Sequence, residues 1–291
     1  MPCLRFPIDR PDNLRAAVGR ITDPLFTGLL ENGSATVDLL ERLCVPVPAL
    51  TIGELLGVPA DLYPDMFDAA TAMFTFDSTS KESGRRLAEA VGWLTDTFVA
   101  LIASKRATPG EDLISGWIRA RDDDDALTED ELVSLAFLMM LAGLENAVLI
   151  TASMIATLLC SDDAPATVAA WQAHRSELME RVAPSPFSIR RFAVADLTFG
   201  DVTIPQGDTV LLSLIGADSD PARNGRRSLM FGRGPHYCLG AQVTNLIIDA
   251  VVPELFVRFP KARLAIPEAD LVYRESWRSH GLTSLPVILT P

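Results

Sequence analysis

A single cysteine, Cys238, stands in a glycine-rich turn, FGRGPHYCLG, that spans residues 231–240. His236 lies two residues before it, and an apolar helical pattern follows from Ala241. The sulfur of a cysteine at such a helix start lies near several backbone N–H groups and near the positive end of the helix dipole. Both surroundings favour the thiolate over the thiol, so the spacing predicts a cysteine that serves as a negatively charged ligand.

A thiolate held in this way is the axial ligand that a haem iron needs, because it pushes electron density toward cleavage of an O–O bond. The alternative interpretation is a structural cysteine after a glycine turn, which a lone Cys-x-Gly would favour. Here the surrounding positions agree with one pattern as a set, and this favours the haem ligand. The positions are Phe231, Gly232, Gly234, His236, Cys238, Leu239 and Gly240.

This set resembles the cysteine motif of the cytochrome P-450 family, the haem-thiolate monooxygenases, in its bacterial type. The resemblance implies a mainly α fold with a smaller β region (α+β) and a single haem domain over residues 1–291. It implies haem b as the cofactor, with Cys238 as the ligand of the metal. The other residues of the motif that it places against the haem are Phe231, Gly232, His236 and Gly240.

The segment from Leu132 to Cys160 carries a single charged residue, Glu145, near its middle. Its length would span a bilayer. The flanks are acidic rather than basic, however, and a helix that is apolar all round is equally typical of the centre of a large soluble protein. We therefore expect a central helix and no membrane contact.

Within this segment, AGLENA at residues 142–147 resembles the AGxET motif of the long helix that passes over the haem in the family. Ala142 and Gly143 lack bulk, so a planar cofactor could approach the backbone there. Glu145 is the acid of the motif, and Asn146 stands where the family usually has a threonine whose hydroxyl passes protons to oxygen. An amide also donates and accepts hydrogen bonds. Glu145 and Asn146 are therefore the predicted catalytic residues.

Two arginines match positions at which the family binds the haem propionates. The stretch LRAAVGRITDP, residues 14–24, resembles the helix along the haem edge and places Arg15 at the first position. Arg191 matches the second. A guanidinium binds a carboxylate in bidentate fashion, so both are predicted to hold the propionates together with His236. A solvated surface arginine is the alternative for Arg15.

The Glu-x-x-Arg pair of the family is altered in this chain. Counting back from the matched stretch that begins at Arg191 places its arginine at Arg181 and leaves Leu178 at the place of the glutamate. Glu177 lies four residues before Arg181, on the same face of a helix, and could replace the missing acid. Otherwise Arg181 is expected to be partly exposed. The meander that follows is shortened, and Arg226 or Arg227 would supply its charge.

The resemblance runs from about Pro11 to the C-terminus. The first section of the family, which includes the helix above the haem and normally covers the substrate, has no counterpart in the sequence. We therefore expect an open substrate pocket, or one that a partner chain closes. Asn245 stands where the helix after the cysteine usually has an arginine.

Composition excludes several other classes of function. The formal net charge is −13, which argues against nucleic acid as a partner because binding phosphates needs a basic patch. Four scattered cysteines and three histidines predict neither a disulfide framework nor a zinc site. The aspartates at 122–125 are expected to form a solvated loop rather than a cation site. The N-terminus has no apolar signal segment, so a cytoplasmic location is expected.

Local signals predict the remaining elements. Ser34 would cap a helix over 35–45, a long helix starts near Glu82, and Thr128 precedes another. Pro24 would end the first helix, residues 161–183 would form two short helices, and a tight turn at Gln206-Gly207 would join two strands.

Three functions follow from these residues. The first is a haem-thiolate monooxygenase that oxidises a small apolar molecule of secondary metabolism. It would receive electrons from a ferredoxin-type donor that docks near Arg20, Arg226, Arg227 and Arg233. The second is non-oxygenase or peroxide-driven haem chemistry, which Asn146 would suit. The third is a non-catalytic helper that activates a partner enzyme such as a glycosyltransferase, although a helper has no need of the thiolate.

Overall fold

The computed structural model describes most of the 291-residue chain, namely residues 11–30, 36–74, 76–124, 127–161, 164–165, 167–182, 185–223, 228–274 and 279–290. Helices dominate this part, and the strands are short. The longer helices are α1 (Pro11–Gly28), α2 (Pro46–Leu56), α3 (Tyr63–Phe74), α4 (Lys81–Ala107), α5 (Leu113–Asp124), α6 (Glu129–Leu159), α7 (Val168–Arg181) and α9 (Ala241–Arg258). The predicted mainly α fold with a smaller β region is confirmed.

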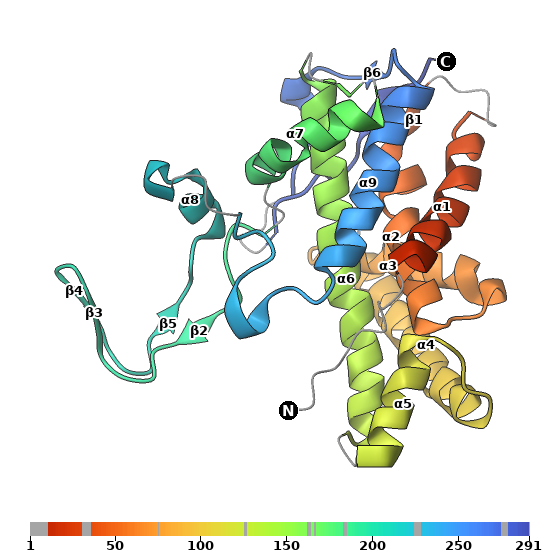
Figure 1. Ribbon diagram of the computed structural model, residues 1–291, viewed down its shortest axis with the longest axis vertical. Coiled ribbons are helices and arrows are strands. Elements are labelled where there is room, and N and C mark those ends of the chain that lie inside the picture. The colour runs from red at the N-terminus through yellow and green to blue at the C-terminus, as the bar shows by residue number, and fades with distance from the viewer. Residues whose placement is uncertain are drawn as a thin grey trace.

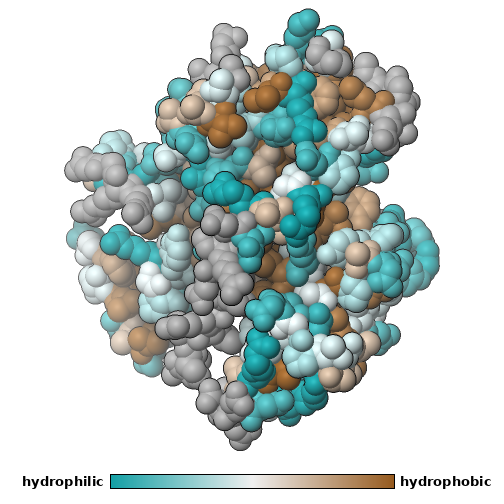
Figure 2. All heavy atoms as spheres, turned by 45° about the vertical axis from the view of Figure 1, so that its right-hand side comes forward, coloured by the Kyte–Doolittle hydropathy of each residue, from teal (hydrophilic) through white to brown (hydrophobic). Residues whose placement is uncertain are grey.

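Helix α6 is the central element of the helical body. It contacts α2, α4 and α9, and α9 in turn contacts α1 and α7 (Figure 1). From Ala147 to Ala156 nearly every side chain of α6 is buried, and α9 contributes Ile248, Val251 and Val252 to the same core. One face of the molecule is shown in Figure 2, where hydrophilic side chains are spread between apolar ones.

A capping box begins α6 at the predicted place. The Thr128 hydroxyl accepts from the backbone N–H of Glu131 at 3.2 Å, and the Glu131 carboxylate accepts from the backbone N–H of Thr128 at 2.7 Å. These bonds lower the pKa of Glu131. The long helix near Glu82 also forms, and the Ser80 hydroxyl caps it by accepting from the N–H of Ser83.

The strands form three small groups. In the first, β7 (Pro286–Ile288) pairs with both β1 (Thr36–Asp38) and β6 (Arg263–Leu264) beside the helices. The others build an arm that extends away from the helical body (Figure 1). In this arm β2 (Arg191–Phe192) pairs with β5 (Thr209–Val210), and β3 (Leu197–Phe199) pairs with β4 (Val202–Ile204). The short helix α8 (Leu214–Ser219) follows β5.

Two predicted boundaries near the N-terminal end are wrong. Pro24 lies inside α1, because burial of Phe26 and Leu29 keeps the last turn in place despite the lost N–H donor. Residues 36–38 form β1 rather than a helix, because β7 supplies a partner strand from the other end of the sequence. A π-helix, Leu40–Cys44, follows instead. Ser34 lies outside the described residues.

Two further expectations need correction. Helix α5 continues to Asp124, and Arg121 supports this end by pairing with Asp122 at 3.2 Å. The described part of 161–183 holds one helix, α7, which the Thr167 hydroxyl caps. The predicted Gln206-Gly207 turn is confirmed, since it joins β4 to β5; each of these strands pairs with another partner, because a second turn at Gly200 closes β3 onto β4.

Two helices, α4 and α6, are long and apolar enough to cross a membrane by length and composition. This is weak evidence for a membrane span, because the core helix of a soluble protein passes the same test. The C-terminal half of α6 is enclosed by other elements of the protein, as its buried residues show.

We predict that Gly281→Ala destabilises the protein by about 1 to 3 kcal/mol. A Cβ at Gly281 would lie 1.9 Å from the Leu149 Cδ2 atom, and Leu149 is fully buried in α6. Chemical unfolding measures the change. Gly92→Ala is the matched control: Gly92 lies in α4 with no atom near its absent Cβ, so alanine there should stabilise by up to about 1 kcal/mol. Equal effects of the two changes would contradict the packing of the C-terminal loop on α6.

Candidate functional site

The turn that holds Cys238 is closed by its own backbone. The Cys238 N–H donates to the Phe231 oxygen at 2.8 Å, and the Gly232 N–H donates to the Leu229 oxygen at 2.7 Å. Gly232 and Gly234 have φ values of 71° and 74°, which residues with a Cβ rarely adopt. Gly232 and Gly234 are therefore required by the shape of this turn.

The Cys238 sulfur lies at the N-terminal end of α9, where the sequence places it. The N–H groups of Gly240 and Ala241 bond to this sulfur and lower the pKa of the thiol, whereas burial raises it by more, so that the pKa lies above its usual value. A half-buried sulfur with two donors is poised to accept a cation in place of its proton, since the donors stabilise negative charge on it.

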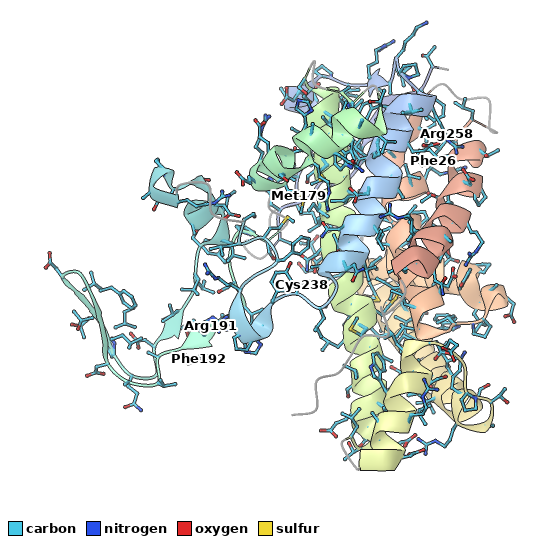
Figure 3. All side chains as sticks on the ribbon, in the orientation of Figure 1. Phe26, Met179, Arg191, Phe192, Cys238 and Arg258 are labelled. Carbon is cyan, nitrogen blue, oxygen red and sulfur yellow. The ribbon has the colours of Figure 1, made fainter. Side chains whose placement is uncertain are left out.

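Helix α9 fixes the position of this sulfur in the protein. Ala241 and Val243 are buried immediately after the turn, and the helix continues along α6 into the core. Its other end is tied to α1, where Arg258 pairs with Asp23 and lies 5.1 Å above the Phe26 ring. Figure 3 shows Cys238 between the helical body and the arm that carries Arg191 and Phe192.

The residues predicted on α6 lie on different faces of that helix. Ala142 and Asn146 are exposed, and the Asn146 amide donates a long, 3.5 Å bond to the Ala142 oxygen. Gly143 faces α2 instead, because a Cβ there would lie 2.9 Å from the Ile52 Cδ1 atom. Glu145 is half-buried and interacts with Arg274: burial lowers the pKa of Arg274, and the Glu145 charge opposes this shift.

The three predicted propionate ligands are all exposed cations or donors. His236 shares the turn of Cys238, Arg15 lies on α1, and Arg191 lies on β2 in the arm. None of the three forms an ion pair within the described part of the chain, so their polar atoms remain available to an anionic group.

Large apolar side chains are exposed both on α6 and beside Cys238. Leu138 and Leu141 on α6 are 56% and 41% exposed, and Tyr237 and Leu239 beside Cys238 are 54% and 59% exposed. Large apolar side chains are usually covered. The chain therefore offers the kinds of group that haem requires, namely a thiol, apolar side chains and cations unpaired among the described residues, although they come from different elements.

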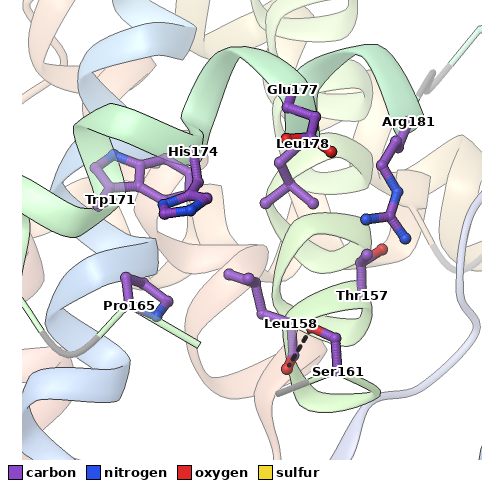
Figure 4. A pocket seen from close by; sticks show the side chains of 9 residues that line it. All are labelled: Thr157, Leu158, Ser161, Pro165, Trp171, His174, Glu177, Leu178 and Arg181. Atoms are coloured by element: carbon purple, nitrogen blue, oxygen red, sulfur yellow. Dashed lines mark hydrogen bonds between the residues drawn. The ribbon is translucent and has the colours of Figure 1, made fainter. Parts of the chain in front are cut away.

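The Glu177–Arg181 pair is not formed. Both side chains are exposed and line a small pocket with Thr157 and Leu178, but no ion pair joins them among the described residues (Figure 4). The expectation that Arg181 would be exposed is confirmed. Arg226 and Arg227, which were expected to serve this network, lie outside the described residues.

Other contacts of α7 were missed by the sequence analysis. Glu180 pairs with Arg223. Trp171 is buried and donates from Nε1 to the Asp249 Oδ1 atom of α9 at 2.8 Å, and Arg175 pairs with the same oxygen at 2.8 Å. Arg175 also donates to Asn245, so a cation from α7 reaches the position at which an arginine was expected. The only available signal was the Trp171–Arg175 spacing of four residues on one helix face.

Comparison with known proteins decides the family. No family model matches the chain. The vitamin D(3) 25-hydroxylase of Pseudonocardia autotrophica is 32% identical over 98% of this chain and 73% of its own length. The 6-deoxyerythronolide B hydroxylase of Saccharopolyspora erythraea is 33% identical over the same shares, and the cytochrome P450 monooxygenase PikC of Streptomyces venezuelae is 33% identical over 97% and 70%. The chain belongs to the cytochrome P450 family.

Solved cytochrome P450 structures agree with the fold. The crystal structure of cytochrome P450 MoxA from Nonomuraea recticatena covers 99% of this chain with a TM-score of 0.88 at 30% identity, and this chain covers 75% of MoxA. The P450 monooxygenase TamI matches 96% of this chain with a TM-score of 0.82 at 33% identity, and this chain covers 70% of TamI. The resemblance seen in the sequence is thus confirmed.

Membership of the P450 family confirms two further predictions. The protein is an oxidoreductase of the P450 monooxygenase type, and its cofactor is haem b. P450 enzymes of this kind act on small organic molecules and need a redox partner of the ferredoxin kind.

We predict that Asp249→Ala destabilises this P450 by about 1 to 3 kcal/mol, because it leaves the buried Trp171 N–H without an acceptor. Urea unfolding followed by tryptophan fluorescence measures the loss. Asp201→Ala, at the exposed tip of the β3–β4 hairpin, is the control and should change stability by no more than about 0.5 kcal/mol. An Asp249→Ala protein as stable as this control would refute the role given to the α7–α9 contact.

Proposed function

We propose that this P450 is a haem-thiolate monooxygenase in which Cys238 is the axial ligand of the iron. The observation that supports this most directly is the half-buried Cys238 sulfur with the N–H groups of Gly240 and Ala241 bonded to it. Such donors favour a thiolate, and a cation bound at the sulfur would offset the burial that raises the pKa of the thiol. When bound, the haem supplies the oxidation chemistry, and the protein supplies orientation and electrostatics.

The side chains around the turn hold the cofactor. Arg15, Arg191 and His236 bind the two propionates, which suits their exposure and their freedom from ion pairs with described residues. Phe231 packs against Tyr237 at 6.4 Å between ring centroids, and this contact shapes the wall of the turn. Gly232 and Gly240 leave room for the haem plane at the same wall.

Residues of α6 serve the opposite side of the cofactor. Ala142 presents only a small side chain there. Gly143 allows α6 to lie close to α2, and this contact fixes the position of α6. Asn146 and Glu145 serve proton delivery: the Asn146 amide is exposed, and Glu145 is half-buried beside Arg274, where its charge opposes the lowering of the Arg274 pKa by burial.

The substrate is a small apolar molecule of secondary metabolism. Relatives of similar identity include the 6-deoxyerythronolide B hydroxylase and the cyclomarin C epoxidase CymV of Salinispora arenicola, which is 32% identical over 94% of this chain. The exposed Leu138 and Leu141 of α6 form an open apolar wall for such a molecule, and a partner chain could cover that wall.

The whole chain, residues 1–291, acts as one haem domain in the cytoplasm. A ferredoxin-type donor docks on the thiolate side, where Arg233 is exposed within the turn. Arg20 is also exposed but pairs with Glu54 at 2.6 Å, which weakens its part in docking. Arg226 and Arg227, the other two cations expected at the docking surface, lie outside the described residues.

We predict that the reduced protein under carbon monoxide shows a Soret band shifted well to the red, as a ferrous thiolate haem does. Cys238→Ser should abolish the shifted band, because a hydroxyl does not replace the thiolate. Cys160→Ser, at an exposed free cysteine, is the matched control and should keep it.

Other outcomes would count against the proposal. A shifted band that survives Cys238→Ser would show that another residue is the ligand. No Soret band in the unmodified protein would instead favour a non-catalytic helper of a partner enzyme.

We predict that Asn146→Thr increases the fraction of consumed electrons that appears in oxidised product. A hydroxyl holds a water at this place, whereas the Asn146 amide is turned back toward the Ala142 oxygen. Because positioned proton transfer contributes about 100-fold or more to rates, a gain of at least about twofold is expected. Product and peroxide are measured together. Asn13→Thr, on the exposed surface of α1, is the control. If this fraction is unchanged or lower in Asn146→Thr, proton delivery is not the step that Asn146 impairs. The same conclusion holds if all consumed electrons already appear in product in the unmodified protein.

A further inference from the structure

A buried carboxylate holds the backbone that leads into the cysteine turn. Asp218, on α8, has a side chain that is only 4% exposed. Its two oxygens accept from the Leu229 N–H at 2.8 and 3.0 Å, and one of them accepts from the Ser228 hydroxyl at 2.5 Å. The same hydroxyl accepts from the Met230 N–H at 3.1 Å. One side chain thus fixes three consecutive residues.

Arg223 joins this carboxylate to α7. Its side chain is 11% exposed, and its guanidinium lies 3.9 Å from the Asp218 Oδ1 atom while donating to the Asp218 backbone oxygen at 2.9 Å. The other end of the guanidinium pairs with Glu180, and this contact raises the pKa of Arg223. Arg223 therefore remains a cation that neutralises the buried Asp218 charge.

Hydrogen bonds continue from Asp218 to the cysteine. The Leu229 oxygen, whose own N–H is held by Asp218, accepts from Gly232 at 2.7 Å, and the Phe231 oxygen accepts from Cys238 at 2.8 Å. An unbroken series of contacts thus links Glu180 on α7 to the residue that carries the sulfur.

We propose that Asp218 and Arg223 form a clamp that positions the cysteine turn and so keeps the Cys238 sulfur in place as an iron ligand. The clamp deepens the proposed function and rests on it. Both are positioning residues, since they act through the backbone of 228–232. The alternative pair, Glu177–Arg181, is not formed. Among the described residues, the ionic link between α7 and this turn is therefore the clamp.

The size of the effect follows from the burial of these groups. Hydrogen bonds to a charged acceptor shielded from water are stronger than neutral ones. Loss of the Asp218 charge leaves the Ser228 hydroxyl and the Arg223 guanidinium with poorer partners, while an amide of the same shape retains one oxygen for the Leu229 N–H. Asp218→Asn therefore loosens the turn without creating a cavity.

Amide hydrogen exchange of the purified full-length protein tests the clamp directly. We expect Asp218→Asn to speed exchange in residues 228–240 by about tenfold or more, because bonds to charged groups contribute at least that factor. Exchange in the middle of α6 should not change. Asp196→Asn is the matched control, since the Asp196 carboxylate also accepts a backbone N–H, that of Gln206, at 2.8 Å, but in the arm. Unchanged exchange of 228–240 in Asp218→Asn would overturn the proposal.

The carbon monoxide spectrum gives the second measurement. Asp218→Asn and Arg223→Gln should convert part of the red-shifted band to an unshifted one, as expected when the thiolate is displaced, while Arg223→Lys should restore most of it. Full retention of the shifted band in both neutral variants would overturn the positioning role. If the unmodified protein has no shifted band, the proposed function fails, and hydrogen exchange still decides whether the clamp holds the turn.

Discussion

The contact between the Cys238 sulfur and the N–H groups of Gly240 and Ala241 depends on α9 being fixed in the core. Those donors point at the sulfur only while the turn keeps its left-handed glycines and the helix begins at Ala241. Burial opposes the negative charge, and the raised pKa of the thiol shows that burial prevails while the sulfur carries a proton. An iron bound at the sulfur would supply the positive charge that reverses this balance.

The elements around α9 supply rigidity from several directions. Trp171 and Arg175 bind α7 to Asp249, and Arg258 binds the far end of α9 to α1. The clamp of Asp218 and Arg223 connects α7 to the entrance of the turn. Helix α6 differs at Leu138 and Asn146, because these two side chains remain exposed. The cysteine turn is thus held from several directions, whereas these side chains of α6 are exposed in the described structure.

The cysteine turn, the long helices and the start of α6 could be predicted from the sequence, because glycine conformations, caps and apolar periodicity act over a few residues. Strand β1 could not, because its partner β7 lies near the other end of the chain. Glu180 and Arg223 were missed for the same reason: they are 43 residues apart, and no local spacing signals their pairing. The contact between Arg175 and Asn245 is a further case, because these residues lie 70 positions apart. Here α7 supplies the cation that was expected on α9 itself.

X-ray absorption at the iron edge of the haem-loaded protein tests the central claim most directly. The account predicts one sulfur atom in the first coordination shell of the iron, and its loss in Cys238→Ser with the fold intact. If the first shell of the iron in the unmodified protein contains only nitrogen and oxygen atoms, the account is contradicted, because the Cys238 sulfur is then not a ligand of the iron.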